Sequence, residues 1–376
     1  MTLPDRCDVA VIGGGPAGSA LAALLARTGR RPLLFERDRF PRRKVCGEFL
    51  SMESKRFLAG IGCLESVKAL GPALIERSRF YSASGRGAEF ALGGTAWGLS
   101  RWALDAALFR HARDCGVLAF EGADVRTLKR GPGSTVMDID LESPGEPPRR
   151  MRLEAEVVID ARGRPPAPAA GAPLFVGYKR HHRPKPGLSA EDVLRGAVEV
   201  HLFPGGYCGL NAVEGGAVNV CLLAQGSWLA SLESTRWDGV SQALAARSPS
   251  LRRRLEALIP DGPPSAVARV SLPPPEAPHD LAVGDAAGMI APLCGDGQAM
   301  ALESALLLAD LIGKTEPSDL NAAWARRWSQ RFSTRIRLGR GLQSLLLRPW
   351  GGELAVGVVG LLPQAARLLL DGTRTH

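Results

Sequence analysis

The stretch from Asp8 to Arg37 reads DVAVIGGGPAGSALAALLARTGRRPLLFER and has the layout of a strand, a glycine turn, a helix and a second strand. An apolar run over residues 9–12 predicts a strand that is buried on both faces. The turn that follows fits the pattern G-x-G-x-x-G through Gly13, Gly15 and Gly18. In this pattern the first glycine permits a tight turn, the second lets the backbone approach a pyrophosphate, and the third lets the helix pack closely on the sheet.

The helix after this turn is predicted to run from about Pro16 to Thr28, with Gly29 as its C-terminal stop. Its N-terminus would present free N–H groups and a partial positive charge to a phosphate. The second apolar run, 33–35, ends at Glu36, whose carboxylate would accept hydrogen bonds from a ribose diol. This order of elements predicts dinucleotide binding, and a glycine-rich turn without a ligand is the alternative.

Composition sets wider limits. The 376 residues suffice for one large or two medium domains with an ample core. The formal net charge of +9 raises nucleic acid or an anionic membrane as partners. Because the basic residues are spread over the chain without a basic run interleaved with aromatics, we expect no nucleic acid. The seven cysteines contain no C-x-x-C pair, which argues against a disulfide framework or a metal site and for a reducing cytoplasm.

The first strand begins almost at Met1, so we expect no signal peptide, and no long uninterrupted apolar run predicts a membrane-spanning helix. Helical spacing occurs over 52–69 and over 99–116, where Ser100 is a good N-cap. Strands and hairpins are predicted in the segments 79–92, 117–120, 124–128, 136–141, 151–153 and 157–160.

A composition shift to Pro, Ala and basic residues over 164–186 is interpreted as a crossing into another domain. Strands over 197–203 and 217–223, with glycine turns between them, predict the centre of an antiparallel sheet. Helices follow to about residue 259, and the proline-rich stretch 273–278 returns the chain to the first domain.

The C-terminal third contains a short buried strand over 281–283, a Pro/Gly loop over 292–297 and a long apolar helix after it. The remainder, 317–376, is predicted to be helical and increasingly apolar. We interpret it as a cover on the core; a lid for a greasy substrate, or a segment in peripheral contact with a membrane, is the alternative.

Three separated motifs carry a resemblance to a known family: GGGPAG with Glu36, Arg101 at the start of a helix, and VGDAAGMIAPLCGDGQAMALESA over 283–305. Together they resemble the FAD-dependent oxidoreductases that include aromatic hydroxylases, flavin halogenases and geranylgeranyl reductases, over most of residues 1–330. The loop KVCGE over 44–48 and the stretch FPGGYCG over 203–209 are most similar to the geranylgeranyl-reductase-like branch.

The resemblance implies roles for individual residues. The glycine turn would hold the FAD pyrophosphate and Glu36 the adenosine ribose, while Arg101 and Asp285 would reach the pyrophosphate or ribityl region. The helix starting near Gly297 would stabilise the reduced ring through its partial positive charge. The implied cofactor contacts are Gly13, Gly15, Pro16, Ala17, Gly18, Glu36, Arg37, Lys44, Val45, Cys46, Arg101, Val125, Gly284, Asp285, Pro292, Gly295, Gly297, Gln298 and Ala299.

The sequence departs from the family pattern at two places. It lacks the Trp-x-Trp-x-x-Pro-type motif of flavin halogenases, which disfavours halogenation, and it reads Asp160-Ala161-Arg162-Gly163 where hydroxylases often carry Asp-Gly. A second G-x-G-x-x-G is also missing. NAD(P)H would therefore bind transiently on the FAD domain, or electrons would come from a reduced partner protein.

Two residues of the 44–48 loop are candidate catalytic groups. Cys46 would contact the ring or act as an acid, with Arg43 and Lys44 favouring its thiolate; a small pocket-lining residue is the alternative. Glu48 would be a proton donor or a base, and a salt bridge with Arg42 or Arg43 is the alternative. A further hypothesis brings Cys46 and Cys294 together across the cofactor.

Other candidates stand outside that loop. Tyr207 would form the floor of a substrate pocket or pack under a hairpin. His181, His182 and His201 are acid–base candidates, although a structural or surface role is favoured for each.

The sequence thus predicts an α/β fold: a Rossmann-type FAD-binding domain with an inserted antiparallel β-sheet substrate domain and a helical C-terminus. The FAD domain would comprise 1–78, 93–165 and 279–325, the substrate domain 79–92 and 166–278, and the C-terminal helical segment 326–376. We expect a cytoplasmic monomer or homodimer that acts on a hydrophobic aromatic, polyketide-like or isoprenoid molecule by hydroxylation or alkene reduction, and that holds no metal. The alternative is an FAD-binding partner protein without catalysis of its own.

Overall fold

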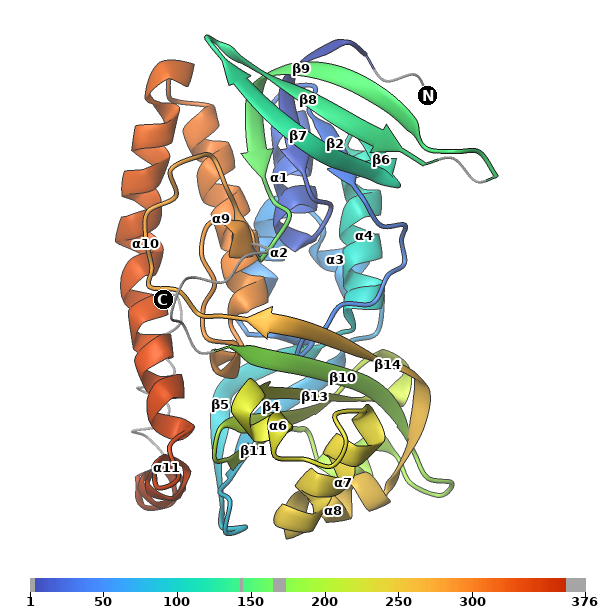
Figure 1. Cartoon of the computed structure of the whole chain (residues 1–376), viewed down its shortest axis with the longest axis vertical. Helices are drawn as coiled ribbons and strands as arrows, with labels where there is room; N and C mark the ends of the chain where they lie inside the picture. Colours follow the sequence, from blue (N-terminus) through green and yellow to red (C-terminus); the bar gives the residue numbers. More distant parts are fainter. Residues whose placement is uncertain (1–3, 143–144, 165–173, 363–376) are drawn as a thin grey trace.

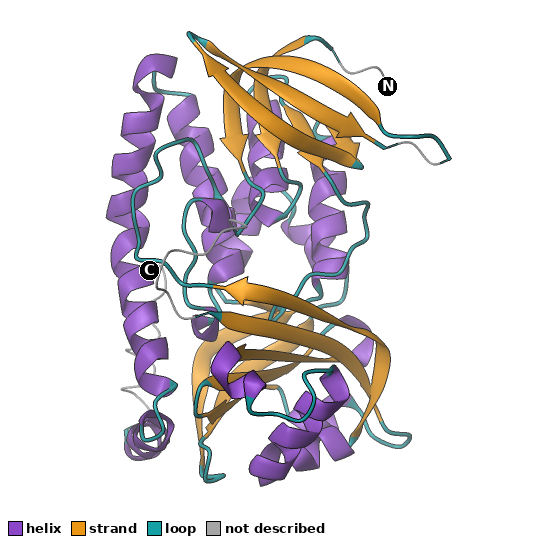
Figure 2. Ribbon diagram, in the orientation of Figure 1, coloured by secondary structure: helices purple, strands orange, loops and turns teal. Residues whose placement is uncertain are grey.

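The computed structural model describes residues 4–142, 145–164 and 174–362. Two sheets lie at opposite ends, with helices between them and along one side (Figure 1, Figure 2). This arrangement confirms the predicted fold class. The domain boundaries themselves stay a prediction, and residues 165–173 of the predicted crossing lie outside the described ranges.

The first sheet has six strands in the order β6-β2-β1-β9-β8-β7. Its central strands β1, β2 and β9 are parallel, and β1 lies between the other two. The bounds are β1 Arg6–Ile12, β2 Leu33–Glu36, β6 Leu118–Glu121, β7 Ala123–Gly131, β8 Ser134–Leu141 and β9 Arg149–Asp160. The predicted strands 151–153 and 157–160 are one strand, because the first half of β9 pairs with β8 and the second half with β1.

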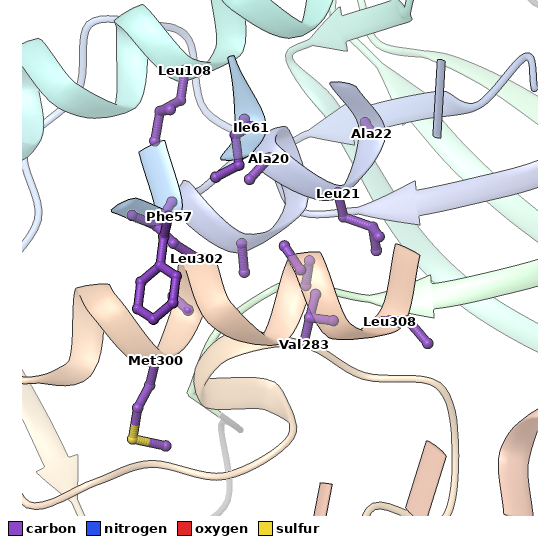
Figure 3. Close-up of a cluster of buried hydrophobic side chains, with 14 of the residues drawn as sticks. Ala20, Leu21, Ala22, Phe57, Ile61, Leu108, Val283, Met300, Leu302 and Leu308 are labelled. Atoms are coloured by element: carbon purple, nitrogen blue, oxygen red, sulfur yellow. The ribbon is translucent and has the colours of Figure 1, made fainter. Parts of the chain in front are cut away.

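Helices cover one face of this sheet and form the main core. Apolar side chains of α1, α2, α4 and α9 meet there, and Figure 3 shows Leu21, Phe57, Leu108 and Leu302 among them. The bounds are α1 Pro16–Arg27, α2 Ser54–Ile61, α3 Leu64–Lys68, α4 Arg101–Asp114 and α9 Gly297–Ile312. The single helix predicted over 52–69 is instead α2 and α3, since Gly62 ends α2 with a φ of +89°.

The second sheet has eight strands in the order β14-β10-β13-β12-β11-β4-β5-β3, and neighbours are antiparallel except β11 and β4. The bounds are β3 Phe49–Leu50, β4 Ala73–Tyr81, β5 Gly87–Gly98, β10 Phe175–Pro184, β11 Ala197–Phe203, β12 Gly206–Ala212, β13 Val218–Gln225 and β14 Leu258–Val270. Four short helices pack beside it: α5 Ala190–Leu194, α6 Gly226–Ala230, α7 Trp237–Arg247 and α8 Pro249–Glu256.

Several predicted strands differ in extent. The hairpin expected over 79–92 reaches from Ala73 to Gly98, and 281–283 contributes only a single bridge between Ala282 and Asp160. The strands β3, β10, β12 and β14 were not predicted. The prolines in β14 are tolerated because it is the edge strand of its sheet, where a missing N–H breaks no central ladder.

The C-terminal helices are α10, Pro317–Leu346, and α11, Gly351–Leu361. α10 is fixed to the first core by Trp324, whose indole N–H donates to the Ala282 carbonyl at 2.9 Å. α11 lies at the foot of α10 beside the second sheet (Figure 1). Residues 363–376 of the predicted helical tail lie outside the described ranges. None of the described helices combines the length and apolarity needed to cross a bilayer.

Candidate active site

The glycine turn between β1 and α1 opens toward two positively charged side chains. Gly13 has a φ of +109°, and a Cβ on Gly18 would collide with the carbonyl of Gly13. A Cβ on Gly15 would instead lie 3.7 Å from Nη2 of Arg101 and 3.9 Å from Nη2 of Arg42. The turn therefore brings backbone and guanidinium groups to one place, which suits a pyrophosphate.

The N-terminus of α1 completes this phosphate site. The helix begins at Pro16, and the next residue, Ala17, is buried. Its first turn has neither a capping side chain nor an acidic residue. The amides of that turn are thus left for an external anion, with the positive end of the helix dipole behind them.

The two arginines share one carboxylate. Arg101, the first residue of α4, donates to both oxygens of Asp105 at 2.6 and 2.7 Å, and Nη1 of Arg42 lies 3.2 Å from Oδ2. Arg42 also lies 3.3 Å from Oε2 of Glu36 and 3.5 Å from Oδ2 of Asp38, so carboxylates fix the positions of both guanidinium groups beside the turn. Burial raises the pKa of Asp285, while the charges of Arg101 and Arg164 oppose that rise. Arg42 was not among the predicted contacts, although the basic run after β2 was a signal for it.

Glu36 lies at the end of β2, at the position predicted for ribose binding. Its buried carboxylate accepts hydrogen bonds from the N–H groups of Gly14 at 2.7 Å and Asp38 at 3.0 Å, and lies 3.3 Å from Arg42. The next residue, Arg37, points to the surface and pairs with Asp38 at 3.7 Å. The ribose contacts of Glu36 and Arg37 stay predictions, as does that of Val125, which is buried in β7.

The predicted second half of the cofactor site is formed by residues 284–299. The N–H of Gly284 donates to Ser304 at 2.9 Å. A short 3₁₀ turn, Pro292–Cys294, is followed by Gly295 with a φ of +70° and by the start of α9 at Gly297. As in α1, the first turn of α9 has no capping side chain and no acidic residue, so its positive end is open to a ligand.

Gln298 in that first turn has an unused acceptor. Its Nε2 donates to the Phe49 carbonyl at 3.4 Å, but its buried Oε1 has no hydrogen-bond partner in the described ranges. A buried carbonyl oxygen rarely lacks a donor. A bound group with an N–H, such as an isoalloxazine ring, would satisfy it. Ala299 beside it is fully buried.

Cys46 links the two halves of the site. Its sulfur accepts hydrogen bonds from the N–H of Glu48 at 3.4 Å and from Nε2 of Gln298 at 3.7 Å, and Arg101 also hydrogen-bonds it. The thiol therefore lies between the N-termini of α4 and α9. Arg43, which was expected to favour the thiolate, donates instead to the Pro263 carbonyl of β14 at 3.2 Å, and its influence on the thiol stays a prediction.

Glu48 is the centre of a buried ion cluster. Its carboxylate has no exposed surface and accepts from the N–H of Arg101 at 2.7 Å, from Nζ of Lys179, and from Nε2 of His181 at 2.6 Å. Burial acts to raise the pKa of Glu48, but the hydrogen bond from His181 and the charge of Lys179 prevail and lower it. The expected salt bridge with Arg42 or Arg43 is therefore wrong.

The second sheet holds the whole 44–48 loop. Lys179 and His181 stand two residues apart on β10 and share a face of the sheet. From neighbouring strands, Asn219 donates to the carbonyls of Cys46 at 3.1 Å and Gly47 at 2.9 Å, and Asn211 donates to that of Glu48 at 3.2 Å. Val45 packs over Gly177 of β10, and burial lowers the pKa of Lys44.

Sequence reasoning missed Lys179, Asn211 and Asn219. For the two asparagines the available signal was a lone amide side chain in an otherwise apolar stretch, whereas Lys179 lies in the basic run KRHHR, which does not single it out.

Two of the candidate histidines belong to other surroundings. His182 points to the opposite face from His181, packs against Trp237 with ring centroids 6.0 Å apart, and has its pKa lowered to about 4 by burial. His201 is buried with Glu199 at 3.4 Å and Ser250 at 3.3 Å. These contacts give both residues a packing role.

Tyr207 and Cys294 lie on the α10 side of the candidate site. Tyr207 is buried in one apolar cluster with Leu293 of the 292–294 turn, and burial raises its pKa well above 10.0. The sulfur of Cys294 faces Gly339 of α10. No disulfide joins Cys294 to Cys46, and their approach across the cofactor stays a hypothesis.

Known proteins share this architecture. A family model described as an FAD binding domain matches residues 6–165. The menaquinone reductase of Mycobacterium tuberculosis is 27% identical over 402 residues, covering 98% of this chain and 92% of the relative. The flavin-dependent halogenase armH1 of Armillaria mellea is 32% identical over 168 residues, 43% of this chain and 32% of the halogenase. Residues 6–165 of this chain are thus similar to an FAD binding domain, and the chain is similar to a menaquinone reductase over nearly its whole length.

Solved structures agree on the fold. Halogenase PltM in complex with phloroglucinol and FAD superimposes with a TM-score of 0.75 at 15% identity, covering 97% of this chain and 82% of that one. Such a likeness shows the fold alone. The family model and the relatives make the chain an FAD-dependent oxidoreductase.

The residues present fit FAD. The open side of Gly15 and the two arginines suit the pyrophosphate of FAD. The uncapped N-termini of α1 and α9 suit the negatively charged and electron-rich parts of the cofactor. Oε1 of Gln298 has no hydrogen-bond donor in the described ranges, and a bound ring N–H would supply one. When bound, FAD would therefore lie between the glycine turn and the start of α9, next to Cys46.

Proposed function

We propose that this FAD-dependent oxidoreductase reduces a carbon–carbon double bond in a hydrophobic, isoprenoid-type substrate. The observation that carries the proposal is the Glu48 cluster, a buried carboxylate with a basic side chain of β10 on each of its oxygens. Saturating a double bond requires a hydride for one carbon and a proton for the other. Bound FAD, reduced by NAD(P)H or by a partner protein, would supply the hydride, and the chain must supply the proton.

His181 is the proposed proton donor. Its side chain is 17% exposed, against 5% for Lys179 and none for Glu48, so it is the member of the cluster that solvent and substrate reach. Because the pKa of Glu48 is lowered, this carboxylate stays ionised, and its 2.6 Å contact with Nε2 of His181 fixes the orientation of the imidazole ring. Glu48 then acts as a positioning residue, and the predicted role of Glu48 as the direct acid is replaced.

The other cluster members prepare the donor. Lys179 balances the charge of Glu48 when the proton has left His181, so the buried carboxylate is never without a positively charged partner. Cys46 lies next to Glu48 and would be covered by the bound ring, so its thiol would shape the reacting pocket.

Similarity along the chain supports a reductase. The relationship to the menaquinone reductase spans nearly the whole of both proteins, whereas that to the halogenase covers less than half of this chain. The apolar cluster containing Tyr207 and Leu293 suits a greasy substrate. Hydroxylation and halogenation are the competing chemistries on the same fold, and the test must distinguish all three.

The test is product analysis with matched variants. The FAD-loaded protein is supplied with NADPH or NADH, or with dithionite as a donor-independent control, and with geranylgeraniol, a menaquinone or a phenol. We expect an isoprenoid product heavier by two hydrogen atoms, and turnover lowered by about 10²-fold in His181→Gln. His182→Gln, on the opposite face of β10, is the control and should retain activity. A phenolic product that has gained oxygen or a halide would contradict the proposal.

A further inference from the structure

The corner between α10 and α11 carries an exposed apolar surface, here called the C-terminal stripe. Its side chains are between 38% and 83% exposed and comprise Leu338, Leu345, Trp350, Leu354, Val358 and Leu361. On α11 the spacing of 354, 358 and 361 places three of them on one helical face. The other face of α11, with Gly352 and Val356, is buried against the protein. α11 is therefore apolar on both faces, and one of them has no cover in the described ranges.

The charges around the stripe have one sign. Arg337 and Arg348 flank it, and neither of them forms an ion pair within the described ranges. The acidic residue of α11, Glu353, is engaged by the N–H and hydroxyl of Ser84 at 2.9 Å. Trp350 has the guanidinium of Arg348 over its ring at 5.9 Å. Tryptophan and arginine at the edge of an apolar face are typical of residues at a membrane surface.

The inner side of the same corner reaches the candidate active site. Leu346, Leu347 and Ala355 pack in one apolar cluster with Tyr207 and Leu293, next to the start of α9. One apolar cluster thus joins the 292–294 turn to the helices that carry the C-terminal stripe.

We propose that the C-terminal stripe docks this protein on the surface of a bilayer containing anionic phospholipid. Burying the stripe among lipid chains removes it from water, and Arg337 and Arg348 face lipid phosphates. A second copy of the chain is disfavoured as the cover, because its stripe would bring the same two positive charges into contact with them. The docking surface stands apart from the proposed reaction and would serve any lipid-soluble substrate.

Vesicle sedimentation of the full-length, FAD-loaded protein tests the proposal. We expect it to pellet with phosphatidylcholine vesicles that contain phosphatidylglycerol, and to pellet less as salt rises above about 0.1 M. The double variant Leu354→Ser/Leu361→Ser should lower the partition coefficient at least tenfold, because two large apolar side chains are no longer removed from water on binding. Leu118→Ser on β6, also an exposed leucine at 42%, is the control and should bind like the unaltered protein.

A second variant separates charge from apolar contact and covers the case in which the serine variant does not fold. Arg337→Gln/Arg348→Gln should weaken binding to the phosphatidylglycerol vesicles by about tenfold and leave binding to pure phosphatidylcholine unchanged. Flavin absorbance and urea unfolding report the folding of each variant. Binding that neither variant alters would overturn the proposal. The proposal would also be overturned if the protein did not bind vesicles and instead formed a dimer that the leucine substitutions dissociate.

Discussion

Replacing Lys179 by methionine measures how much the buried ion pair of Glu48 and Lys179 contributes to the free energy of unfolding. The change leaves Glu48 ionised in a place where it has no exposed surface, while the lost ammonium itself was only 5% exposed. Removing one partner of such a buried pair costs about 3–5 kcal/mol of unfolding free energy. Because His181 and the Arg101 N–H still hold the carboxylate, we expect the lower end, about 3 kcal/mol.

A double-mutant cycle gives the coupling. Glu48→Gln/Lys179→Met removes both charges, and neutral replacement of a buried pair costs little. The double variant should therefore be more stable than Lys179→Met alone, with a coupling free energy of about 2 kcal/mol from urea unfolding. Strictly additive effects would mean that the two side chains do not depend on each other.

The pH dependence of stability distinguishes the loss of the ion pair from a simple loss of packing, because a packing loss does not change with pH. The pKa of Glu48 lies below its ordinary value of 4.5 in the folded protein, so its contribution is fully present above that pH and is lost as pH falls through the folded pKa. In Lys179→Met the carboxylate takes up its proton at higher pH. The stability difference between the two proteins should therefore be largest near neutral pH and shrink below about pH 4.5. A difference under about 1 kcal/mol, or one independent of pH, would refute the reasoning.

Three further predictions concern the cofactor and the second sheet. Gly15→Val should lower FAD affinity at least about tenfold without changing the urea midpoint, because the new side chain meets the pyrophosphate position rather than the backbone; a variant that unfolds would contradict this. Arg42→Gln should weaken FAD binding by about tenfold in a fluorescence titration, and Arg43→Gln, which contacts β14, should not. Burial lowers the pKa of His182 from 6.5 to about 4, so stability should fall as pH drops through this window, by at most about 1.4 kcal/mol per pH unit. His182→Phe should lack that slope, and equal slopes in the two proteins would exclude His182 as its source.

The parts of the fold that were predictable depend on short stretches of chain. The β1–turn–α1–β2 unit follows from apolar runs and from glycines whose backbone angles and close contacts permit little else. The Pro/Gly loop before α9 likewise predicted where this helix begins. In both places the local preference and the final structure agree.

The parts that sequence could not supply depend on distant pairing. Glu48 and Lys179 are 131 positions apart, and only the placement of β10 beside the 44–48 loop brings them together. The prolines of β14 read as a loop, yet the edge of a sheet tolerates them. Asn219 looked like one polar residue in an apolar strand, and its function as a donor to two loop carbonyls required the tertiary structure.

The most direct test of the central claim is an anaerobic single turnover. The FAD-loaded protein is reduced with dithionite, mixed with an isoprenoid alkene in the absence of oxygen, and followed by its flavin absorbance. The proposal predicts that the flavin is reoxidised in proportion to alkene added, with one saturated product for each cofactor. A flavin that stays reduced until oxygen is admitted, with a product that gains oxygen instead of hydrogen, would contradict it.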